Sequence, residues 1–203
     1  MSEKNMRPAD QIKYRLIRWL RAGAYDIIIP NYYIGRWEMD VMRVLSTGYM
    51  VEYEIKVSRA DFKADFKKAF TSWRDKEVVN KHVETSQGKR DCNRFFFVTP
   101  EGMITCNEVP KYAGLMYCSD EGVRIVKNAP LLHKRKFEKY QDVAQGLSFR
   151  EQRLRADVNF LKFQYEQAGN MIQNLKMQLQ EFYDKYPDAD REQFDNPTLK
   201  RKK

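Results

Sequence analysis

Two neighbouring segments decide the fold: Arg36-Trp-Glu-Met-Asp-Val-Met-Arg-Val44 and, after Leu45-Ser-Thr-Gly48, Tyr49-Met-Val-Glu-Tyr-Glu-Ile-Lys-Val57. Both segments are rich in β-branched, aromatic and other apolar residues with polar residues between them, a pattern typical of strands. The short connection ending in glycine suits a hairpin turn. The sequence therefore predicts two antiparallel strands joined by a tight turn.

Acidic side chains gather on this predicted hairpin. Because side chains alternate along a strand, Glu54 and Lys56 share one face, together with Glu52. On the preceding strand, Glu38 and Asp40 share a face in the same way. We expect the hairpin to bring the two faces together, so that three or four carboxylates and one lysine meet at one end of a sheet.

Such crowding disfavours ionisation, and burial adds a desolvation penalty. A divalent cation relieves both, and Mg²⁺ (or Mn²⁺) prefers carboxylate oxygens and water as ligands. A bound ion can hold a phosphoryl oxygen and acidify a water, while Lys56 positions that water or balances charge. The competing interpretations are a solvated strand face for Glu54 and Lys56, a salt-bridge role for Glu38, and a surface or charge-balancing role for Glu52.

Outward from the hairpin, the predicted elements alternate between helices and strands. Ser58 and Asp61 resemble a capping box that opens a helix with Phe62, Phe66 and Phe70 on one face, continuing to about residue 82. The other predicted elements are a helix over 10–22 capped by Asp10, a strand over 25–29 stopped by Pro30, and strands over 94–99, 113–118 and 123–126. The fold class is therefore α/β.

Composition narrows the class of protein. The chain has 203 residues and 24.3 kDa with 42% apolar residues, which suits a domain with a core rather than wholesale disorder. It lacks an apolar run long enough to span a membrane, and its polar N-terminus does not resemble a secretory signal. Cys92, Cys106 and Cys118 lack CxxC spacing, which argues against a disulfide framework. We therefore expect a cytoplasmic protein without a membrane partner.

The charge balance points to a nucleic acid. The formal net charge is +9, from 37 basic and 28 acidic residues. Residues 147–203 hold 11 basic and 9 acidic side chains, so the preceding part holds 26 and 19, a net charge of +7. Cations that neutralise phosphates gain affinity through counterion release. The expected partner is a nucleic acid, although a merely soluble basic protein has the same composition.

Nine residues are candidates for contacts with the nucleic-acid backbone: Lys63, Lys67, Lys81, His82, Lys89, Arg90, Lys134, Arg135 and Lys136. The first two also fit a solvated helix face that includes Asp65 and Lys68, and the last three fit a solvated helix start. For His82, a structural role is the competing interpretation.

The C-terminal part is helical. Nine residues alternate at spacings of four and three: Leu154, Val158, Leu161, Tyr165, Ala168, Ile172, Leu175, Leu179 and Phe182. This is the seam of a coiled coil over four heptads. The helix either folds back on the first domain or pairs with a second copy as a homodimer. The predicted organisation is a domain over 1–146, a coiled-coil extension over 147–187 and a basic, disordered tail over 188–203.

One motif resembles a known family. Asp40, followed after thirteen residues by Glu54-Ile-Lys56, resembles the signature of the PD-(D/E)XK nuclease superfamily. The resemblance is closer to the MmcB-like DNA repair proteins and their phage relatives. It is carried by Glu54-Ile-Lys-Val-Ser-Arg-Ala-Asp-Phe62, by Cys92-Asn-Arg-Phe-Phe-Phe-Val-Thr-Pro-Glu-Gly102 and by Val109-Pro-Lys-Tyr-Ala-Gly-Leu115. It covers roughly residues 11–132 and leaves out the C-terminal helix.

The resemblance implies a restriction-endonuclease-like core, a central mixed sheet flanked by helices. It implies an Mg²⁺-dependent deoxyribonuclease, an endonuclease of bacterial or phage DNA repair or replication, in which Lys56 is the catalytic lysine. It makes Asp40 and Glu54 the metal ligands, with the backbone carbonyl of Ile55. Glu38 stands in for a first-helix glutamate that is missing here, or the site holds a single metal. The alternatives are a non-catalytic DNA-binding or assembly protein on the same scaffold, and an enzyme that acts on RNA.

Overall fold

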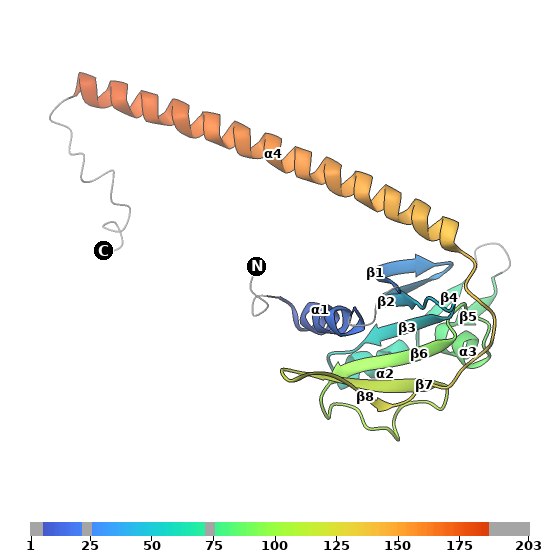
Figure 1. Cartoon of the computed structure of the whole chain (residues 1–203). Coiled ribbons are helices and arrows are strands. Elements are labelled where there is room, and N and C mark those ends of the chain that lie inside the picture. The colour runs from blue at the N-terminus through green and yellow to red at the C-terminus, as the bar shows by residue number, and fades with distance from the viewer. Residues whose placement is uncertain (1–5, 22–25, 72–75, 187–203) are drawn as a thin grey trace. The chain divides into compact units, whose positions relative to one another are not determined.

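The computed structural model describes residues 6–21, 26–71 and 76–186. The chain divides into two compact units, residues 1–138 and residues 139–203 (Figure 1). The first holds a mixed sheet with its helices, and the second holds one long helix. The two units are described separately below.

The first unit is built on a six-stranded sheet in the order β1-β2-β3-β6-β7-β8. Its strands are β1 (Ile27–Ile34), β2 (Trp37–Val44), β3 (Met50–Ile55), β6 (Arg94–Pro100), β7 (Ala113–Ser119) and β8 (Gly122–Lys127). The three central strands β3, β6 and β7 run parallel, and the outer pairs are antiparallel. The predicted α/β class is confirmed, and so are the predicted strands over 94–99, 113–118 and 123–126.

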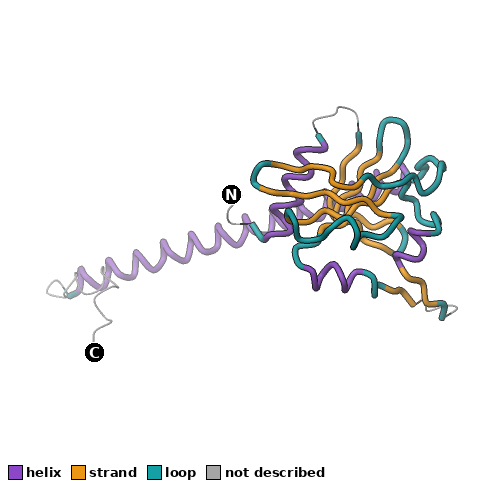
Figure 2. Tube along the Cα trace, turned by 90° about the horizontal axis from the view of Figure 1, so that it is seen from below, coloured by secondary structure: helices purple, strands orange, loops and turns teal. Residues whose placement is uncertain are grey.

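Helices cover both faces of this sheet. The helix α1 (Pro8–Leu20) buries Ile12, Leu16 and Leu20 against one face. The opposite face packs against the short helices α2 (Arg59–Asp65) and α3 (Lys81–Ser86) and the loop that precedes β7. Figure 2 shows the strands crossing the middle of the unit with helices around them.

The register between the central strands decides what each face carries. Glu52 pairs with Phe95 and Glu54 pairs with Phe97 across β3 and β6. Side chains of directly paired residues lie on the same face of a sheet. The two glutamates therefore lie on the face that the phenylalanines share with α2 and α3, while Tyr53 packs toward α1.

The start of the chain differs from the prediction in two places. The helix α1 begins at Pro8, and Asp10 lies in its first turn, where it pairs with Arg7 rather than capping the helix. The strand predicted over 25–29 is β1, which begins at Ile27 and continues through Pro30 to Ile34, and residue 25 lies outside the described residues. Because β1 is the edge strand of the sheet, the missing N–H of proline leaves no partner unbonded.

The predicted helix through Phe70 is wrong. Ser58 caps α2 as expected, because its side chain accepts a hydrogen bond from the N–H of Asp61, but α2 ends at Asp65. Phe70 lies instead on β4 (Ala69–Thr71), which pairs with β5 (Val78–Asn80) in a second, two-stranded sheet. The side chain of Asn80 then accepts hydrogen bonds from two backbone N–H groups and starts α3, so the chain turns twice where one helix was predicted.

The second unit contains α4 (Tyr140–Lys185), a helix of 46 residues. It begins before residue 147, where the sequence placed the start of the extension, and the predicted tail over 188–203 lies outside the described residues. No helix in the described ranges combines the length and the apolar character that crossing a bilayer requires.

Candidate active site

Asp40 and Glu54 lie side by side. The pairing of Val41 with Tyr53 places Asp40 opposite Glu54, one step further along the two antiparallel strands. Glu54 also raises the pKa of Asp40, after burial as the larger cause. The two carboxylates therefore meet on one face at the end of β3, as the sequence predicted.

The side chain of Asp40, on β2, bonds to the backbone of the neighbouring strand β3. Its Oδ2 atom accepts a hydrogen bond of 2.8 Å from the N–H of Ile55, where a regular ladder would place a backbone carbonyl. In a strand, the N–H and C=O groups of one residue point to the same side. The carbonyl of Ile55 therefore faces Asp40, while the N–H of Lys56 turns the other way and donates to Val98 on β6.

Three lysines surround the carboxylate of Glu54. Its Oε1 atom accepts hydrogen bonds from Lys56 at 2.9 Å and from Lys68 at 2.7 Å, and its Oε2 atom accepts one from Lys81 at 2.6 Å. Lys56 and Lys81 are buried, whereas the side chain of Lys68 is 45% exposed. Three side chains of the protein therefore hold the Glu54 carboxylate in place. Of these three lysines, Lys68 is the one that solvent reaches.

Asp65 is the second anchor of Lys56. The sequence predicted a solvated position, but the Asp65 carboxylate is fully buried on the inner face of α2. It accepts hydrogen bonds from Lys56 at 2.7 Å, from Lys68 at 2.6 Å and from His82 Nε2 at 2.6 Å. Although burial opposes ionisation, these three partners lower the pKa of Asp65 well below its usual range.

His82 connects Asp65 to Tyr112. Because an ionised carboxylate can only accept, the Nε2 atom that lies against Asp65 carries the proton. The hydroxyl of Tyr112 lies 2.8 Å from the other ring nitrogen. Burial, followed by the charge of Asp65, raises the pKa of Tyr112, so the phenol keeps its proton. The chain Tyr112–His82–Asp65 thus fixes one side of Lys56.

Glu52 lies deeper on the same face and is fully buried. It forms ion pairs with Lys81 at 3.0 Å and with Arg90 at 2.7 Å. Although burial opposes ionisation, these two cations lower the pKa of Glu52. Burial, and then the negative charge of Glu52, raises the pKa of Cys92 to about 12, so that thiol stays protonated. Glu52 therefore balances charge, one of the two roles considered for it.

The buried groups form one network, called here the charge network. Its acids are Asp40, Glu52, Glu54 and Asp65, and its cations are Lys56, Lys68, Lys81 and Arg90. Positive and negative groups match in number, which offsets much of the cost of burying them. Within residues 6–21, 26–71 and 76–186, no group of three or more His, Cys, Asp or Glu side chains is arranged to hold a metal ion.

Glu38 does not join the pair. Its carboxylate accepts a hydrogen bond of 2.9 Å from the hydroxyl of Tyr33, across the antiparallel pairing of β1 and β2, and it is exposed. This contact raises the pKa of Tyr33 through the hydrogen bond and the charge of Glu38. The expected group of three or four carboxylates is therefore a pair, Asp40 with Glu54, and Lys13 of α1 lies beside it, 3.7 Å from Asp40 Oδ1.

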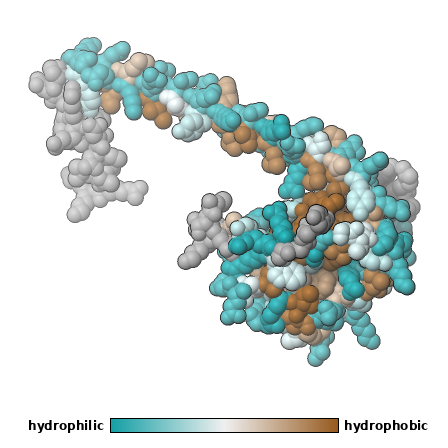
Figure 3. All heavy atoms as spheres, viewed as in Figure 1, coloured by the Kyte–Doolittle hydropathy of each residue, from teal (hydrophilic) through white to brown (hydrophobic). Residues whose placement is uncertain are grey.

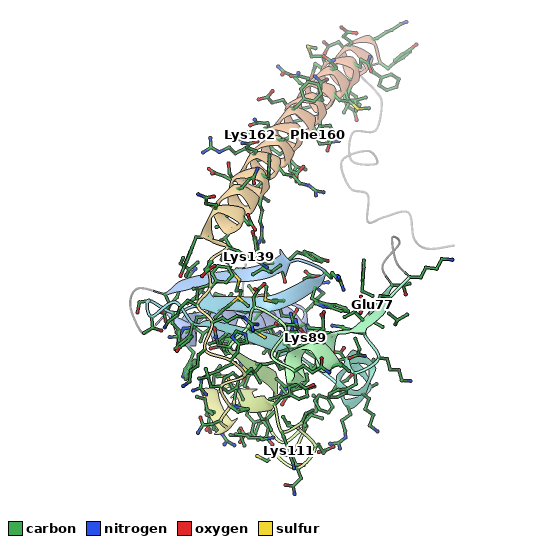
Figure 4. The ribbon with its side chains drawn as sticks, turned by 90° about the vertical axis from the view of Figure 1, so that its right-hand side faces the viewer. Glu77, Lys89, Lys111, Lys139, Phe160 and Lys162 are labelled. Carbon is green, nitrogen blue, oxygen red and sulfur yellow. The ribbon has the colours of Figure 1, made fainter. Side chains whose placement is uncertain are left out.

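The nine basic candidates separate into two sets by their surroundings. Lys63, Lys67, Lys89 and Lys134 are exposed, and Lys89 lies just beyond α3 (Figure 4). The others have partners inside the protein: Lys81, His82 and Arg90 belong to the charge network or contact it, Arg135 donates to the carbonyls of Gly88 and Arg90, and Lys136 donates to the carbonyl of Thr47. The first set presents exposed ammonium groups to a ligand in this conformation.

Four residues of the site were missed or misplaced by the sequence: Lys13, Asp65, Lys68 and Tyr112. A signal existed for Asp65, because it lies three residues after Phe62 and so on the apolar face of α2. Tyr112 lies on a loop 30 residues after its partner His82, and Lys13 lies on another element, so local spacing could not have joined them to the site.

Among the comparisons with known proteins, a solved structure shares the fold of this chain. No family model matches the chain, and no curated protein matches it. A solved structure described as a protein of unknown function, SPO1766 from Silicibacter pomeroyi, is similar with a TM-score of 0.53. The two are 24% identical, and the similarity covers 74% of this chain and 93% of that one.

Proposed function

We propose that this protein is a metal-dependent nuclease that hydrolyses phosphodiester bonds in DNA, with a site of the PD-(D/E)XK kind and a closer resemblance to the MmcB-like DNA repair proteins and their phage relatives. One observation carries the proposal. Asp40 and Glu54 meet across β2 and β3, and the ammonium group of Lys56 lies 2.9 Å from Glu54 on the same face. Paired carboxylates beside a fixed lysine suit metal-assisted attack of water on phosphorus.

The donor set fits one hard cation. Mg²⁺ is typically bound by one or two carboxylates and otherwise by water and substrate phosphate, so Asp40, Glu54 and the carbonyl of Ile55 are sufficient. Burial, and after it the charge of Glu54, raises the pKa of Asp40, and a cation bound beside the pair would offset both effects. Room for the ion requires Lys68 to withdraw from Glu54, and its half-exposed side chain is free to reach solvent.

When bound, the ion supplies a polarised phosphoryl oxygen and a more acidic water. The protein holds the remaining groups in place. Lys56 is clamped between Glu54 and Asp65, so its ammonium group is a fixed cation that can stabilise negative charge developing on the phosphate. Asp65, His82 and Tyr112 are positioning residues, because they act on the substrate only through Lys56.

The exposed lysines give this site a route to a nucleic-acid backbone. Lys63 lies in the last turn of α2, and Lys67 follows that helix next to Lys68 of the charge network. The part of the chain before residue 147 has a net charge of +7. Contacts from such lysines to phosphates would give affinity without base specificity. These lysines support a nucleic acid as the substrate. The choice of DNA over RNA rests on the resemblance to the MmcB-like DNA repair proteins.

A second candidate is a non-catalytic DNA-binding or assembly protein. One observation favours it: the four acids of the charge network are matched by four cations from the chain itself, so the network is satisfied without a metal. In that case the carboxylates serve to hold β2, β3, α2 and α3 together, and the exposed lysines alone bind DNA.

The deciding experiment compares the native protein with Asp40→Asn. Each is incubated with single-stranded, duplex, nicked and branched DNA and with RNA, in Mg²⁺, Mn²⁺ or EDTA. The nuclease proposal expects cleavage of DNA that EDTA abolishes and that the variant lacks. Asp40→Asn is preferred to a change at Glu54, because Glu54 binds three buried or half-buried cations whose loss of partner would also weaken the fold.

DNA binding by both proteins in EDTA, with no cleavage of any substrate in either metal, would instead support the binding protein. Cleavage that is confined to RNA would keep the site chemistry and change the substrate. Undiminished cleavage by Asp40→Asn would overturn the assignment of the site.

A further inference from the structure

The longest helix among the described residues, α4, carries an apolar stripe that the other described residues leave exposed. Along α4, the large seam residues are between 40% and 82% exposed: Leu154, Val158, Leu161, Tyr165, Ile172, Leu175, Leu179 and Phe182. Figure 3 shows hydrophobic residues in brown along this helix. Exposed apolar area of this extent marks an interaction surface.

The spacing assigns each seam residue to a heptad position. Steps of three residues lead from an a to a d position and steps of four lead from d to the next a. The a positions are therefore Val158, Tyr165, Ile172 and Leu179, and the d positions are Leu154, Leu161, Ala168, Leu175 and Phe182. β-branched residues at a with leucine at d favour two parallel strands. Val158 and Ile172 supply the first feature, and three of the five d positions supply the second.

The charges beside the seam favour the same orientation. The e positions that follow Leu154, Leu161 and Leu175 hold Arg155, Lys162 and Lys176. Antiparallel helices set e positions opposite e positions, so these cations would face one another and repel. Parallel helices set g opposite e of the next heptad, which brings Asp157 to the second copy's Lys162. The parallel pair gains an attraction where the antiparallel pair has repulsion.

The surface of the helix already has the hollows that such packing needs. One hollow is bounded by Val158, Leu161, Lys162 and Tyr165, which are consecutive a, d, e and a positions. A second includes Glu151, Leu154, Arg155 and Val158, the same four positions one heptad earlier. In knobs-into-holes packing, each seam side chain enters a hole formed by four residues of the facing helix. The d residues of a second helix fit these two holes.

We infer that α4 pairs with α4 of a second copy of this chain as a parallel, in-register, two-stranded coiled coil. Four heptads are enough for a specific pairing. The helix α4 begins at Tyr140, two residues after the first unit ends. In a parallel pair, both copies of the first unit are therefore joined to the N-terminal end of the coiled coil. The inference does not depend on the nuclease proposal, since it uses residues of the second unit alone.

Apolar residues of α4 that lie outside the seam include Phe149, Phe160, Phe163, Met171 and Met177. Figure 4 shows Phe160 and Lys162 projecting from opposite sides of α4, so Phe160 points away from the side of the seam on which Lys162 lies. Phe160 and Phe163 are at positions c and f, which a coiled coil leaves uncovered, so a further partner would be needed to bury them. The oligomeric state is therefore the first quantity to measure.

Light scattering on the full-length protein is expected to give twice the chain mass of 24.3 kDa at micromolar concentration. The double variant Leu161→Glu with Leu175→Glu is expected to return the monomer, because it places charges in the core of the pair. Gln173→Glu is the matched control, since position b faces solvent and the dimer should persist. A monomeric native protein, or one of three or four chains, would overturn the inference.

Orientation is tested by cysteine crosslinking in a Cys106→Ser background, which removes the exposed native thiol. Leu154→Cys alone is expected to form a disulfide-linked dimer on mild oxidation, because in a parallel, in-register pair each seam residue faces its own copy. An antiparallel pair would instead crosslink only when Leu154→Cys is mixed with Leu179→Cys near the other end. That result, or the absence of any crosslink from Leu154→Cys, would overturn the parallel arrangement.

Discussion

The two units of this protein depart from the usual distribution of polar and apolar groups in opposite ways. The first unit buries the carboxylates of Glu52, Glu54 and Asp65 and the ammonium groups of Lys56 and Lys81 on one face of its sheet, while the second exposes an apolar stripe along α4. Buried charge and exposed apolar surface are the informative exceptions in a folded protein. The first indicates chemistry or a rigid scaffold, and the second indicates a partner.

The two units also differ in whether they need a partner from outside the chain. The charge network is internally satisfied, so nothing outside the chain is required to hold it. The apolar stripe is unsatisfied, and another surface is required to cover it. Substitutions in the network should therefore act on stability or cleavage within one copy, whereas substitutions in the stripe should act on association.

The largest expected effect is on cleavage. Asp40→Asn removes a charge beside Glu54 but keeps an oxygen that can accept from the N–H of Ile55. If the pair holds a metal, we expect DNA cleavage in Mg²⁺ to fall by about 10³-fold, on the order of losing one major electrostatic contact. Thermal unfolding, measured in parallel, should change little. A variant that unfolds but retains its activity per folded molecule would assign Asp40 to stability instead.

Asp65→Ala should have the largest effect on stability. It leaves the buried ammonium of Lys56 with one carboxylate fewer, and removing one partner of a buried pair costs about 3–5 kcal/mol. Urea denaturation followed by circular dichroism measures the change. Lys67→Ala, an exposed neighbour on the same segment, is the control and should cost well under 1 kcal/mol.

Acid should weaken the first unit through the same residues. The pKa values of Glu52 and Asp65 are lowered from 4.5 and 3.8, so the unfolded state binds more protons than the folded state at low pH. Their contribution is fully present above about pH 5 and is lost as the pH falls through 4 toward their folded values. The raised pKa of Asp40 acts in the opposite direction.

Urea midpoints at pH 7, 5, 4 and 3 test the acid effect, with Asp65→Asn as the comparison. The native protein should lose stability most steeply below about pH 4, where the carboxylates of the unfolded chain take up protons, and the variant should lose less, because one of the two responsible groups is gone. Parallel curves for the two proteins would mean that Asp65 does not contribute.

The smallest expected effect is that of Lys68→Ala. Its ammonium group is 45% exposed, so loss of its ion pairs with Glu54 and Asp65 should change stability by less than about 1 kcal/mol. We expect Mg²⁺ or Mn²⁺ binding to become tighter by a few fold in calorimetry, because this lysine no longer competes for Glu54. Weaker metal binding would show that Lys68 does not occupy the metal position.

The local pattern predicted much of the sheet and of the pair. Alternation on β2 and β3 placed Asp40, Glu54 and Lys56 correctly, because the period of a strand and a short hairpin leave little freedom in register. The same reasoning failed at Phe70, where a spacing of four matched a helix but Asn80 and the β4–β5 pairing took over. It also failed at Glu38, which shares a face with Asp40 but engages Tyr33 instead.

The α/β class, the hairpin with its acidic pair and the heptad seam of α4 could all be predicted, since each follows from short-range periodicity. Which cations neutralise the acids depends instead on contacts between distant parts of the chain. Lys81, His82 and Tyr112 come from α3 and a later loop, and the parallel pairing of β3 with β6 brings them together. Charge compensation in a protein interior depends on distance in space, and spacing along the chain does not encode it beyond a single element.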